Sequence, residues 1–466
     1  MMLRHRPPSP DAVADAKRIM TVSSAFDCHG HSGDEIFDAI VLGAGITGLV
    51  SASILHDLGC RNIAVIDEFE NIGGNHIDRS INGYTFDIGS LIFQDDSPLL
   101  KYFPELLEHY VPIKPTWGKL TPQAFVTSYP LSIRDDIVRA GPWGIFRIVL
   151  SAAFSRVARR RIGNAREFAR YWIGDYLLRR SGLESYMKRF FGVPADWVDL
   201  EFAEKRMLWI KEHASPRVLL RYVRRHRAPG PTNRQLARPR EGFNALYEVA
   251  ARTLRQRGSV FHLGERIESI TRRGTQFDVR TGGRRLTAQR LISTIPIART
   301  LALCGVREDP GLASVTLISL YFSFDGNRGF DCSILYNFAH DGAWKRLTMY
   351  SDFYGRVEGR EYFGVEVIAG HANDSVAIAE QDFRAHVAKN GLFAGDLVCE
   401  GSQVVPCAYP IYTGQAHERV SRALAQLADF GIESFGRQGG FDYQPTARVS
   451  TLNAAAHLMP TRTSDA

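Results

Sequence analysis

The chain has 466 residues and a formal net charge of +7, and 45% of its residues are hydrophobic while 23% are charged. A single core stops growing at roughly 250–300 residues, so we expect two or more domains with the composition of an ordinary soluble globular protein. The longest apolar stretch, residues 142–154, is interrupted by Arg147 and is shorter than the roughly 20 residues of a bilayer span, so we expect no transmembrane helix.

The first 36 residues mix charged residues, prolines and small residues, and they lack the apolar centre of a secretory signal. We expect residues 1–36 to be a flexible N-terminal extension. Six cysteines are scattered along the chain without CxxC spacing, which favours reduced thiols and a cytoplasmic location. The tract Cys28-His29-Gly30-His31 offers metal-binding side chains without a fourth ligand, so we expect no metal site.

The stretch FDAIVLGAGITGLVSASILHDLGCRNIAVIDE predicts a βαβ unit near the amino end of the chain. Its apolar runs and its glycine turn indicate a strand over residues 37–42, a helix over about 46–58, and a second strand over 62–66. The second strand is followed by an acidic residue, Asp67.

The turn between the first strand and the helix matches the pattern G-x-G-x-x-G. In this pattern Gly43 permits the tight turn, Gly45 lets the backbone approach a pyrophosphate, and Gly48 lets the helix pack on the strand. The helix N-terminus then presents free N–H groups and about half a positive charge to the phosphates. Asp67 lies 19 residues beyond Gly48, where a ribose-binding carboxylate is expected. We therefore predict a dinucleotide site that includes Gly43, Ala44, Gly45, Ile46, Thr47, Gly48, Asp67 and Glu68.

A second glycine pair favours FAD over a nicotinamide nucleotide. Gly73-Gly74 follows Asp67 by six residues, an arrangement typical of FAD proteins, in which a second glycine turn crosses near the pyrophosphate. The chain then continues into INGYTFDIGSLIF instead of another helix and strand. We therefore predict FAD as the cofactor and add Gly73, Gly74 and Asn75 to its contacts.

Positive charge is concentrated in one segment. Between Arg156 and Arg240 there are 18 Arg and 3 Lys against 8 acidic residues, a net charge of +13, so the remainder of the chain carries −6. Three interpretations stay open: a solvated helical surface, a peripheral membrane contact that begins at IFRIVLSAAFSRVARRR, and a cleft for an anionic substrate, since the arginine fork suits phosphates. We expect no nucleic acid to bind, because the segment lacks the interleaved aromatic residues of a base-stacking surface.

The amino-terminal pattern resembles the FAD-binding half of the glutathione-reductase-type flavoproteins, which include amine oxidases, protoporphyrinogen oxidases and UDP-galactopyranose mutases. Later stretches resemble the last two groups in the order of that family, so the resemblance covers roughly residues 37–458. These stretches are GYTFDIGSLIF (83–93), SGLESYMKRFFGVPADWVDLEFAEKRM (181–207), PREGFNALYEVAARTLRQRGSVFHLGERIESI (239–270), LISTIP (291–296), AYPIY (408–412) and GRQGGFDY (436–443).

The resemblance implies an α/β fold with a glutathione-reductase-type FAD-binding Rossmann domain, an inserted helical domain and a mixed β-sheet substrate domain. Strand-like runs at 276–281, 315–324 and 362–369 agree with such a mixed architecture. We expect the first part of the FAD-binding domain at 37–100, a largely helical, Arg-rich insert at 101–235, a second FAD-binding part at 236–300, a β-sheet substrate domain at 301–415, and a C-terminal FAD-binding part with the tail at 416–466.

The resemblance also implies further cofactor contacts. The family's adenine-side backbone contact would fall near Ile267, and its last cofactor element would include Gly436 and Arg437. The mutases carry a motif resembling Gly-x-His-Ile-Phe-His beside the flavin, and the matching stretch GSLIFQ has Leu91 and Gln94 in place of both histidines. Leu91 would be an apolar contact on the flavin ring.

On the substrate side, the resemblance points to one arginine and three tyrosines. Arg346 falls where the mutases have an arginine that grips the substrate diphosphate, and Tyr409 falls on a substrate-contacting tyrosine, with Tyr412 close by. Tyr443 lies in the last family element, where Ala447 replaces the usual acidic residue. The ordinary alternatives are a surface salt bridge for the arginine and β-sheet packing for the tyrosines.

We expect an FAD-dependent oxidoreductase or isomerase that acts on an anionic small molecule, such as a nucleotide-linked sugar or a secondary-metabolite intermediate. The flavin would carry the chemistry, so no catalytic side chain is assigned, and NAD(P)H is a candidate reductant. One alternative is a UDP-galactopyranose mutase that contracts a pyranose to a furanose through an adduct at N5 of the reduced flavin. Another is a non-catalytic escort protein similar to the Rab GDP-dissociation inhibitors. The sequence leaves the oligomeric state open.

Overall fold

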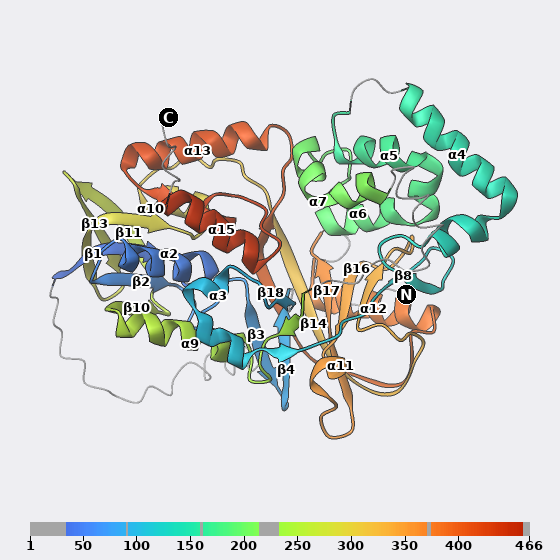
Figure 1. The fold of residues 1–466 in the computed structure, drawn as a ribbon, viewed down its shortest axis with the longest axis horizontal. Coiled ribbons are helices and arrows are strands. Elements are labelled where there is room, and N and C mark those ends of the chain that lie inside the picture. Colours follow the sequence, from blue (N-terminus) through green and yellow to red (C-terminus); the bar gives the residue numbers. More distant parts are fainter. Residues whose placement is uncertain (1–33, 90–91, 159–161, 214–232, 371–373, 460–466) are drawn as a thin grey trace, which may run out of the picture.

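The computed structural model describes residues 34–89, 92–158, 162–213, 233–370 and 374–459. Figure 1 shows two sheet-centred bodies beside each other, with a group of helices above the second one. Most of the expected extension 1–36, and also Leu91, lie outside the described residues.

The first body is built on a mixed sheet. Its described strands are β1 (Asp34–Leu42), β2 (Ile63–Asp67), β10 (Ser259–Leu263), β11 (Ile267–Arg273), β12 (Gln276–Thr281), β13 (Arg285–Ser293) and β19 (Glu433–Ser434). They run in the order β10-β2-β1-β13-β12-β11, and β19 pairs with β13. β1 pairs in parallel with β2 and β13, whereas β12 is antiparallel to β11 and β13. Segments far apart in the sequence thus make one sheet.

Helices cover both faces of this first sheet. They are α2 (Ile46–Asp57), α9 (Phe243–Gln256), α10 (Ile297–Leu303), α13 (Ala416–Phe430) and α15 (Ala447–Leu458). Ala39 and Val41 of β1 belong to the core that includes α2, α9 and α15, whereas Ile40 and Leu42 belong to the core that includes α10 and α13. Because residues 39–42 of β1 are buried on both faces, this part of the strand needs a continuous apolar run rather than an alternating one.

The predicted βαβ unit lies at the centre of the first sheet. α2 begins at Ile46, as expected, and β1 begins three residues before the predicted strand. Gly43 has a φ of +104°, and a Cβ on Gly48 would lie 1.9 Å from the Gly43 carbonyl oxygen. α2 therefore packs so closely on the turn that no side chain fits at Gly48.

The second body is built on a largely antiparallel sheet. Its described strands are β7 (Trp117–Leu120), β8 (Val126–Ser128), β14 (Ser314–Arg328), β15 (Ile334–Asn337), β16 (Trp344–Met349), β17 (Glu361–Ile368) and β18 (Phe393–Pro410). They run in the order β18-β14-β17-β16-β15-β7-β8. Phe322 and Phe363 of this sheet pack on Phe383 of α12 (Val376–Lys389). β7 and β8 come from the segment expected to be largely helical, because β15 offers β7 a parallel partner from a distant part of the chain.

Four helices form the group above the second sheet in Figure 1, and they are α4 (Gly141–Ala158), α5 (Ala165–Arg180), α6 (Leu183–Phe191) and α7 (Leu200–His213). α5 begins after Asn164, whose Oδ1 accepts a hydrogen bond from Glu167 N at 2.9 Å. Within α5, a Cβ on Gly174 would lie 2.7 Å from Ala152 N. The backbones of α4 and α5 are therefore in direct contact.

Short elements complete the described part of the chain. They are β3 (Ile77–Ile81), β4 (Tyr84–Ile88), β5 (Phe93–Gln94), β6 (Val111–Pro112), β9 (Gln235–Ala237), α3 (Leu99–Tyr102), η1 (Pro104–His109), η2 (Ile133–Ile137), η3 (Val138–Ala140), α11 (Ser351–Tyr354), and α14 (Gly436–Gly439). β3 and β4 pair with each other, and β5-β9-β6 form a small sheet that joins segments from before and after the helical group.

Among the described residues, one helical stretch meets the length and composition of a membrane span. It covers Ile133–Val157, 25 residues within which an 18-residue window reaches a mean hydropathy of 1.3. This finding differs from the expectation of no such helix, which rested on residues 142–154 alone. A single stretch of this kind is weak evidence for a span. Gly141, with φ 72° and ψ 172°, moreover separates η3 from α4.

We predict that Gly48→Ala lowers the free energy of unfolding by about 1–3 kcal/mol, because α2 must move away from the Gly43 carbonyl. Gly283→Ala is the matched control, since nothing lies within 4 Å of a Cβ at that position. Urea unfolding followed by far-UV circular dichroism measures both variants. Equal unfolding midpoints would contradict the close packing of α2 on the turn.

Candidate active site

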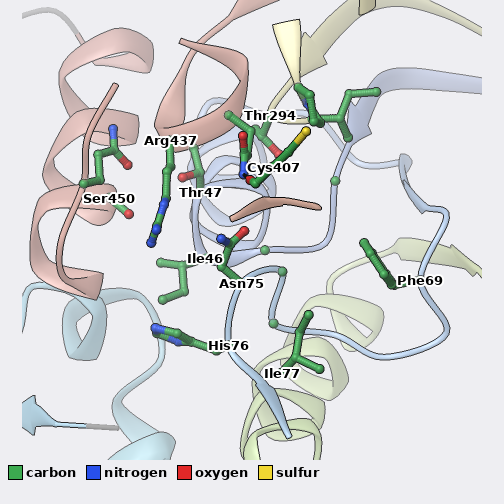
Figure 2. A pocket seen from close by; sticks show the side chains of 18 of the residues that line it. Ile46, Thr47, Phe69, Asn75, His76, Ile77, Thr294, Cys407, Arg437 and Ser450 are labelled. Atoms are coloured by element: carbon green, nitrogen blue, oxygen red, sulfur yellow. Dashed lines mark hydrogen bonds between the residues drawn. The ribbon is translucent and has the colours of Figure 1, made fainter. Parts of the chain in front are cut away.

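A cleft opens where β1 and β2 end and α2 begins. It holds about 990 Å³ of empty space, which includes the open solvent at its mouth. Figure 2 shows Ile46, Asn75, His76 and Arg437 arranged around it. Nine predicted cofactor contacts line this cleft: Gly43, Gly45, Ile46, Thr47, Asp67, Gly73, Gly74, Asn75 and Arg437.

Two glycine turns meet at the cleft, backbone against backbone. Gly45 forms an isolated parallel bridge with Gly73, whose N–H donates to the Ala44 carbonyl at 3.0 Å. A Cβ on Gly74 would lie 2.8 Å from Gly45 Cα. The contact therefore requires glycine, and it leaves bare backbone on the wall of the cleft.

The N-terminus of α2 faces the same space. Its N-cap residue, Gly45, has no side chain that could accept a hydrogen bond from the first turn, and Ile46 and Thr47 of that turn line the cleft. The first N–H groups of a helix and its dipole together attract anions. This arrangement fits the pyrophosphate of a dinucleotide.

Asp67, at the end of β2, is buried beneath the glycine turn. Its Oδ2 accepts a hydrogen bond from Ala44 N at 2.7 Å, and its Oδ1 accepts one from Phe69 N at 2.9 Å. Burial raises the pKa of Asp67, although the two backbone donors act in the opposite direction. The carboxylate thus fixes the turn while lining the cleft, the position expected of a ribose-binding group.

Five predicted cofactor residues lie outside the lining of the cleft: Ala44, Gly48, Glu68, Ile267 and Gly436. Ala44 and Gly48 shape the turn itself. Arg299 Nη2 donates to Glu68 Oε1 and to the Ile267 carbonyl, both at 2.8 Å. The Ile267 carbonyl thus already has a hydrogen-bond donor in Arg299. The expected contact between Ile267 and the adenine remains a prediction.

The N-terminus of α15 forms another wall of the cleft. Thr446 caps this helix by accepting a hydrogen bond from Val449 N at 3.4 Å, and Ala447 and Ser450 line the cleft beside it. The Oε1 atom of nearby Gln444 is buried without a hydrogen-bond partner among the described residues. Bare backbone, two helix N-termini and an unused acceptor together fit a flavin dinucleotide.

A second cavity adjoins the cleft and reaches the second sheet. It holds about 1020 Å³ of empty space, including its mouth, and Asn75, His76, Val405, Arg437 and Pro445 line both spaces. Burial, helped by the charge of Arg437, lowers the pKa of His76 to about 3, so its ring is neutral near pH 7. A molecule in the cavity would therefore lie next to the ligand of the cleft.

Arg346, Lys345 and Glu366 form a buried ion cluster in the wall of this cavity. Lys345 Nζ lies 2.6 Å from Glu366 Oε2, while Arg346 Nη2 contacts Glu366 Oε1 and donates to the Gly89 carbonyl at 2.6 Å. Burial by itself would raise the pKa of Glu366, but the charges of Arg346 and Lys345 lower it to about 2. Burial likewise disfavours the charged form of Arg346, but Glu366 outweighs this effect and raises its pKa.

Arg437 adds a third cation to the cavity. Its Nη2 donates to the Ala408 carbonyl at 2.8 Å, and burial lowers its pKa, although an arginine stays protonated in proteins. In the described chain, the buried Nε–H groups of Arg346 and Arg437 have no hydrogen-bond partner. The charged side chains of the lining are three cations and Glu366, which leaves a net charge of +2. The positive lining therefore suits the cavity to an anion.

The structure brings Arg346, Tyr409 and Tyr443 together in the cavity, but it does not bring Tyr412 there. The Tyr409 hydroxyl donates to the Phe190 carbonyl at 2.7 Å, and its ring meets that of Tyr443 edge to face. The Tyr412 hydroxyl donates to the Phe441 carbonyl at 2.5 Å and accepts from Tyr443 N at 3.2 Å. Tyr412 thus holds the loop that contains Phe441 and Tyr443. This contact agrees with the packing role for Tyr412 rather than with substrate binding.

Lys345, Glu366 and His76 are functional candidates that the sequence patterns did not single out. Glu366 stands inside the apolar strand run YFGVEVI, and an acidic residue in such a run signals a buried partner. Consecutive strand residues ordinarily point to opposite faces, but the pairing of β16 with β17 shifts register between Trp344 and Arg346. This irregularity at Lys345 lets two consecutive cations reach one carboxylate.

Solved structures share this fold. A reduced UDP-galactopyranose mutase matches with a TM-score of 0.74 and 18% identity, over 91% of this chain and 94% of the other. A candidate protoporphyrinogen oxidase from Exiguobacterium matches with a TM-score of 0.68 and 16% identity, over 92% and 98%. Putrescine oxidase bound to putrescine matches with a TM-score of 0.54 and 13% identity, over 91% and 99%. These matches confirm the predicted fold class. No curated protein sequence matches the chain significantly.

The sequence family described as flavin-containing amine oxidoreductases matches residues 46–303, which is more than half of the chain. This match confirms the predicted FAD cofactor and favours an enzyme over the non-catalytic escort alternative. It also agrees with the cleft, where glycine backbone and the N-terminus of α2 provide the dinucleotide site. The chain belongs to the flavin-containing amine oxidoreductase family and is an FAD-dependent enzyme.

Proposed function

We propose that this flavoenzyme acts on an anionic small molecule held in the second cavity. The observation that carries the proposal is the lining of this cavity, whose charged side chains are three cations and one carboxylate and leave a net charge of +2. The flavin, when bound, supplies hydride or electron transfer. A nucleotide-linked sugar is the substrate class that we favour, because the arginine fork suits the oxygens of a diphosphate.

The residues that line the cavity have different roles in binding the anion. Arg346, Arg437 and Lys345 supply the positive charge that attracts the anion, and Glu366 holds the Arg346 and Lys345 side chains in place. The Lys345 ammonium lies 5.3 Å from the ring centres of both Phe190 and Tyr409. These rings shield the Lys345 ammonium from water on one side, which strengthens its attraction for an anion.

An amine substrate is the obvious alternative, because the family is described by amine oxidation and a structural neighbour was solved with putrescine. A polyamine carries positive charges, however, and it would face Lys345, Arg346 and Arg437 with one carboxylate to offset them. Juxtaposed like charges disfavour the wrong partner by several kcal/mol. The lining therefore favours an anion over an amine.

Replacement of Arg346 tests the anion site. We predict that Arg346→Met weakens the binding of inorganic pyrophosphate and of UDP to the FAD-loaded enzyme about 10–100-fold, since a hydrogen bond to a charged group contributes roughly 1.5–3 kcal/mol. Isothermal titration calorimetry measures the affinity, and flavin absorbance should show unchanged FAD content. Arg356→Met is the control, because Arg356 is exposed and pairs with Glu361. Equal affinities in the two variants would refute the role of Arg346.

Glu366→Gln should have the opposite effect on anion binding. It raises the net charge of the lining by one unit, so pyrophosphate should bind more tightly, as the same calorimetric titration would show. The variant should also lose about 3–5 kcal/mol of stability near pH 7, because two buried cations lose their partner. Weaker pyrophosphate binding by a folded Glu366→Gln enzyme would contradict this electrostatic account.

The pH dependence of stability gives a second measure of Glu366. Its pKa in the folded protein is depressed to about 2 from an ordinary 4.5, so its contribution is fully present above the ordinary value and is lost as the pH falls toward 2. Urea unfolding at a series of pH values should show the gap between wild type and Glu366→Gln narrowing over that window. A gap that stays constant would show that Glu366 does not titrate as described.

Ring contraction of a UDP-sugar is the redox-neutral alternative, because the same cations would hold its diphosphate. Leu91 and Gln94 stand in place of the mutase histidines and count against it. Anaerobic incubation of dithionite-reduced enzyme with UDP-galactose separates the alternatives. We expect no furanose product, and a furanose formed only by the reduced enzyme would instead establish the mutase reaction.

A further inference from the structure

The outer face of α4 carries an exposed apolar stripe that the active site does not explain. Its side chains recur at intervals of mostly three or four residues, so they share one side of the helix, and each is more than half exposed. The apolar stripe consists of Trp143, Phe146, Val149, Leu150, Phe154 and Val157. The rings of Trp143 and Phe146 stack with centroids 5.4 Å apart. Contiguous exposed apolar surface of this kind marks an interaction site.

The opposite face of α4 is committed to α5. The Gly174 backbone abuts Ala152, and Ser151 Oγ accepts a hydrogen bond from Tyr176 N at 3.1 Å. These contacts fix the rotation of α4 about its axis, so the stripe has to point outward. Figure 1 shows α4 at the outer edge of the helical group, far from the first sheet.

The charges of α4 indicate what covers the stripe. The helix contains two arginines and no acidic residue, and the three residues that follow Ala158 in the sequence are also arginines. Arg147 lies over the Tyr176 ring at 4.7 Å, and Arg156 Nη2 donates to the Trp172 carbonyl at 3.3 Å. Both are exposed beside the stripe. An apolar face with aromatic residues, bordered by arginines, is the pattern of a helix at an anionic lipid surface.

We propose that α4 docks this enzyme on an anionic lipid bilayer, with the apolar stripe in the headgroup region and the helix in the plane of the membrane. A second copy of the chain is a poorer occupant, because a symmetric contact through the stripe would bring like-charged arginines together. Crossing the bilayer is also disfavoured. Gly141 ends the preceding helical turns, and the 18 residues of α4 by themselves fall short of the roughly 20 of a span.

Vesicle flotation of the full-length, FAD-loaded enzyme tests the proposal. We expect it to float with vesicles of phosphatidylcholine mixed with phosphatidylglycerol, to bind vesicles of phosphatidylcholine alone at least tenfold more weakly, and to be released by salt. The triple variant Phe146→Ser, Leu150→Ser, Phe154→Ser should lose at least tenfold in binding while keeping its flavin absorbance. The double variant Trp197→Ser, Ile378→Ser is the control, because both side chains are exposed outside α4.

A charge variant keeps the test decisive if the triple variant does not fold. Arg147→Gln, Arg156→Gln should leave α4 apolar but weaken the preference for anionic vesicles, since two of the five arginines in and directly after α4 are lost. Three results would overturn the proposal: no flotation of the wild type, flotation that the charge and stripe variants share unchanged, or a concentration-dependent dimer in analytical ultracentrifugation that only the stripe variant abolishes. Resistance of the membrane-bound enzyme to alkaline carbonate extraction would overturn the in-plane orientation as well.

Discussion

The contact between two glycine turns determines where this enzyme can bind a dinucleotide. Gly48 packs on the Gly43 carbonyl, and Gly74 packs on the Gly45 backbone, so the polypeptide reaches the cleft without any side chain in front of it. The backbone N–H groups at the start of α2 then face the cleft, and they attract phosphate oxygens. Thr294, at the end of β13, donates to the Leu42 carbonyl at 2.8 Å and thereby attaches the neighbouring strand to the same turn. The position of the second cavity follows from this arrangement, since five residues line both spaces.

The second constraint is electrostatic. Burying Lys345 and Arg346 without a counterion would be unfavourable, and Glu366 reduces that penalty by pairing with both. One carboxylate cannot neutralise two cations, and Arg437 adds to the excess. The protein can therefore fold with this cluster buried, while the cavity keeps a positive electrostatic potential. That potential acts most strongly where water is excluded. The anion preference that we propose therefore rests on three charges of the second sheet and on Arg437 of α14, while the glycine turns of the first body provide the cofactor cleft.

Much of the cofactor cleft could be predicted from the sequence because its chemistry is local. The tight turn, the close helix and the acidic residue at the end of β2 are separated by few residues, and backbone geometry alone places them.

The substrate side could be predicted only in part. Tyr409 lines the cavity but Tyr412 does not. The Tyr412 hydroxyl instead bonds to the Phe441 carbonyl, which comes from a loop distant in the sequence. Lys345 faces the cavity because strand pairing is irregular beside it, and no local pattern announces such a shift. The second sheet likewise recruits β7 and β8 from a segment of otherwise helical character, since β15 supplies the pairing.

The order of segments around the cleft has a consequence for biosynthesis. Residues near 43–77 form one wall, those near 294–296 another, and 405–407 with 437–450 the last. A ribosome therefore releases the phosphate-binding turn well before α15. A nascent chain that stops before residues 437–450 thus has a cleft that lacks one wall, and FAD retention would require α15, near the carboxyl end of the described residues. Shortening the protein from that end would accordingly produce a colourless product whose amino-terminal strands still assemble.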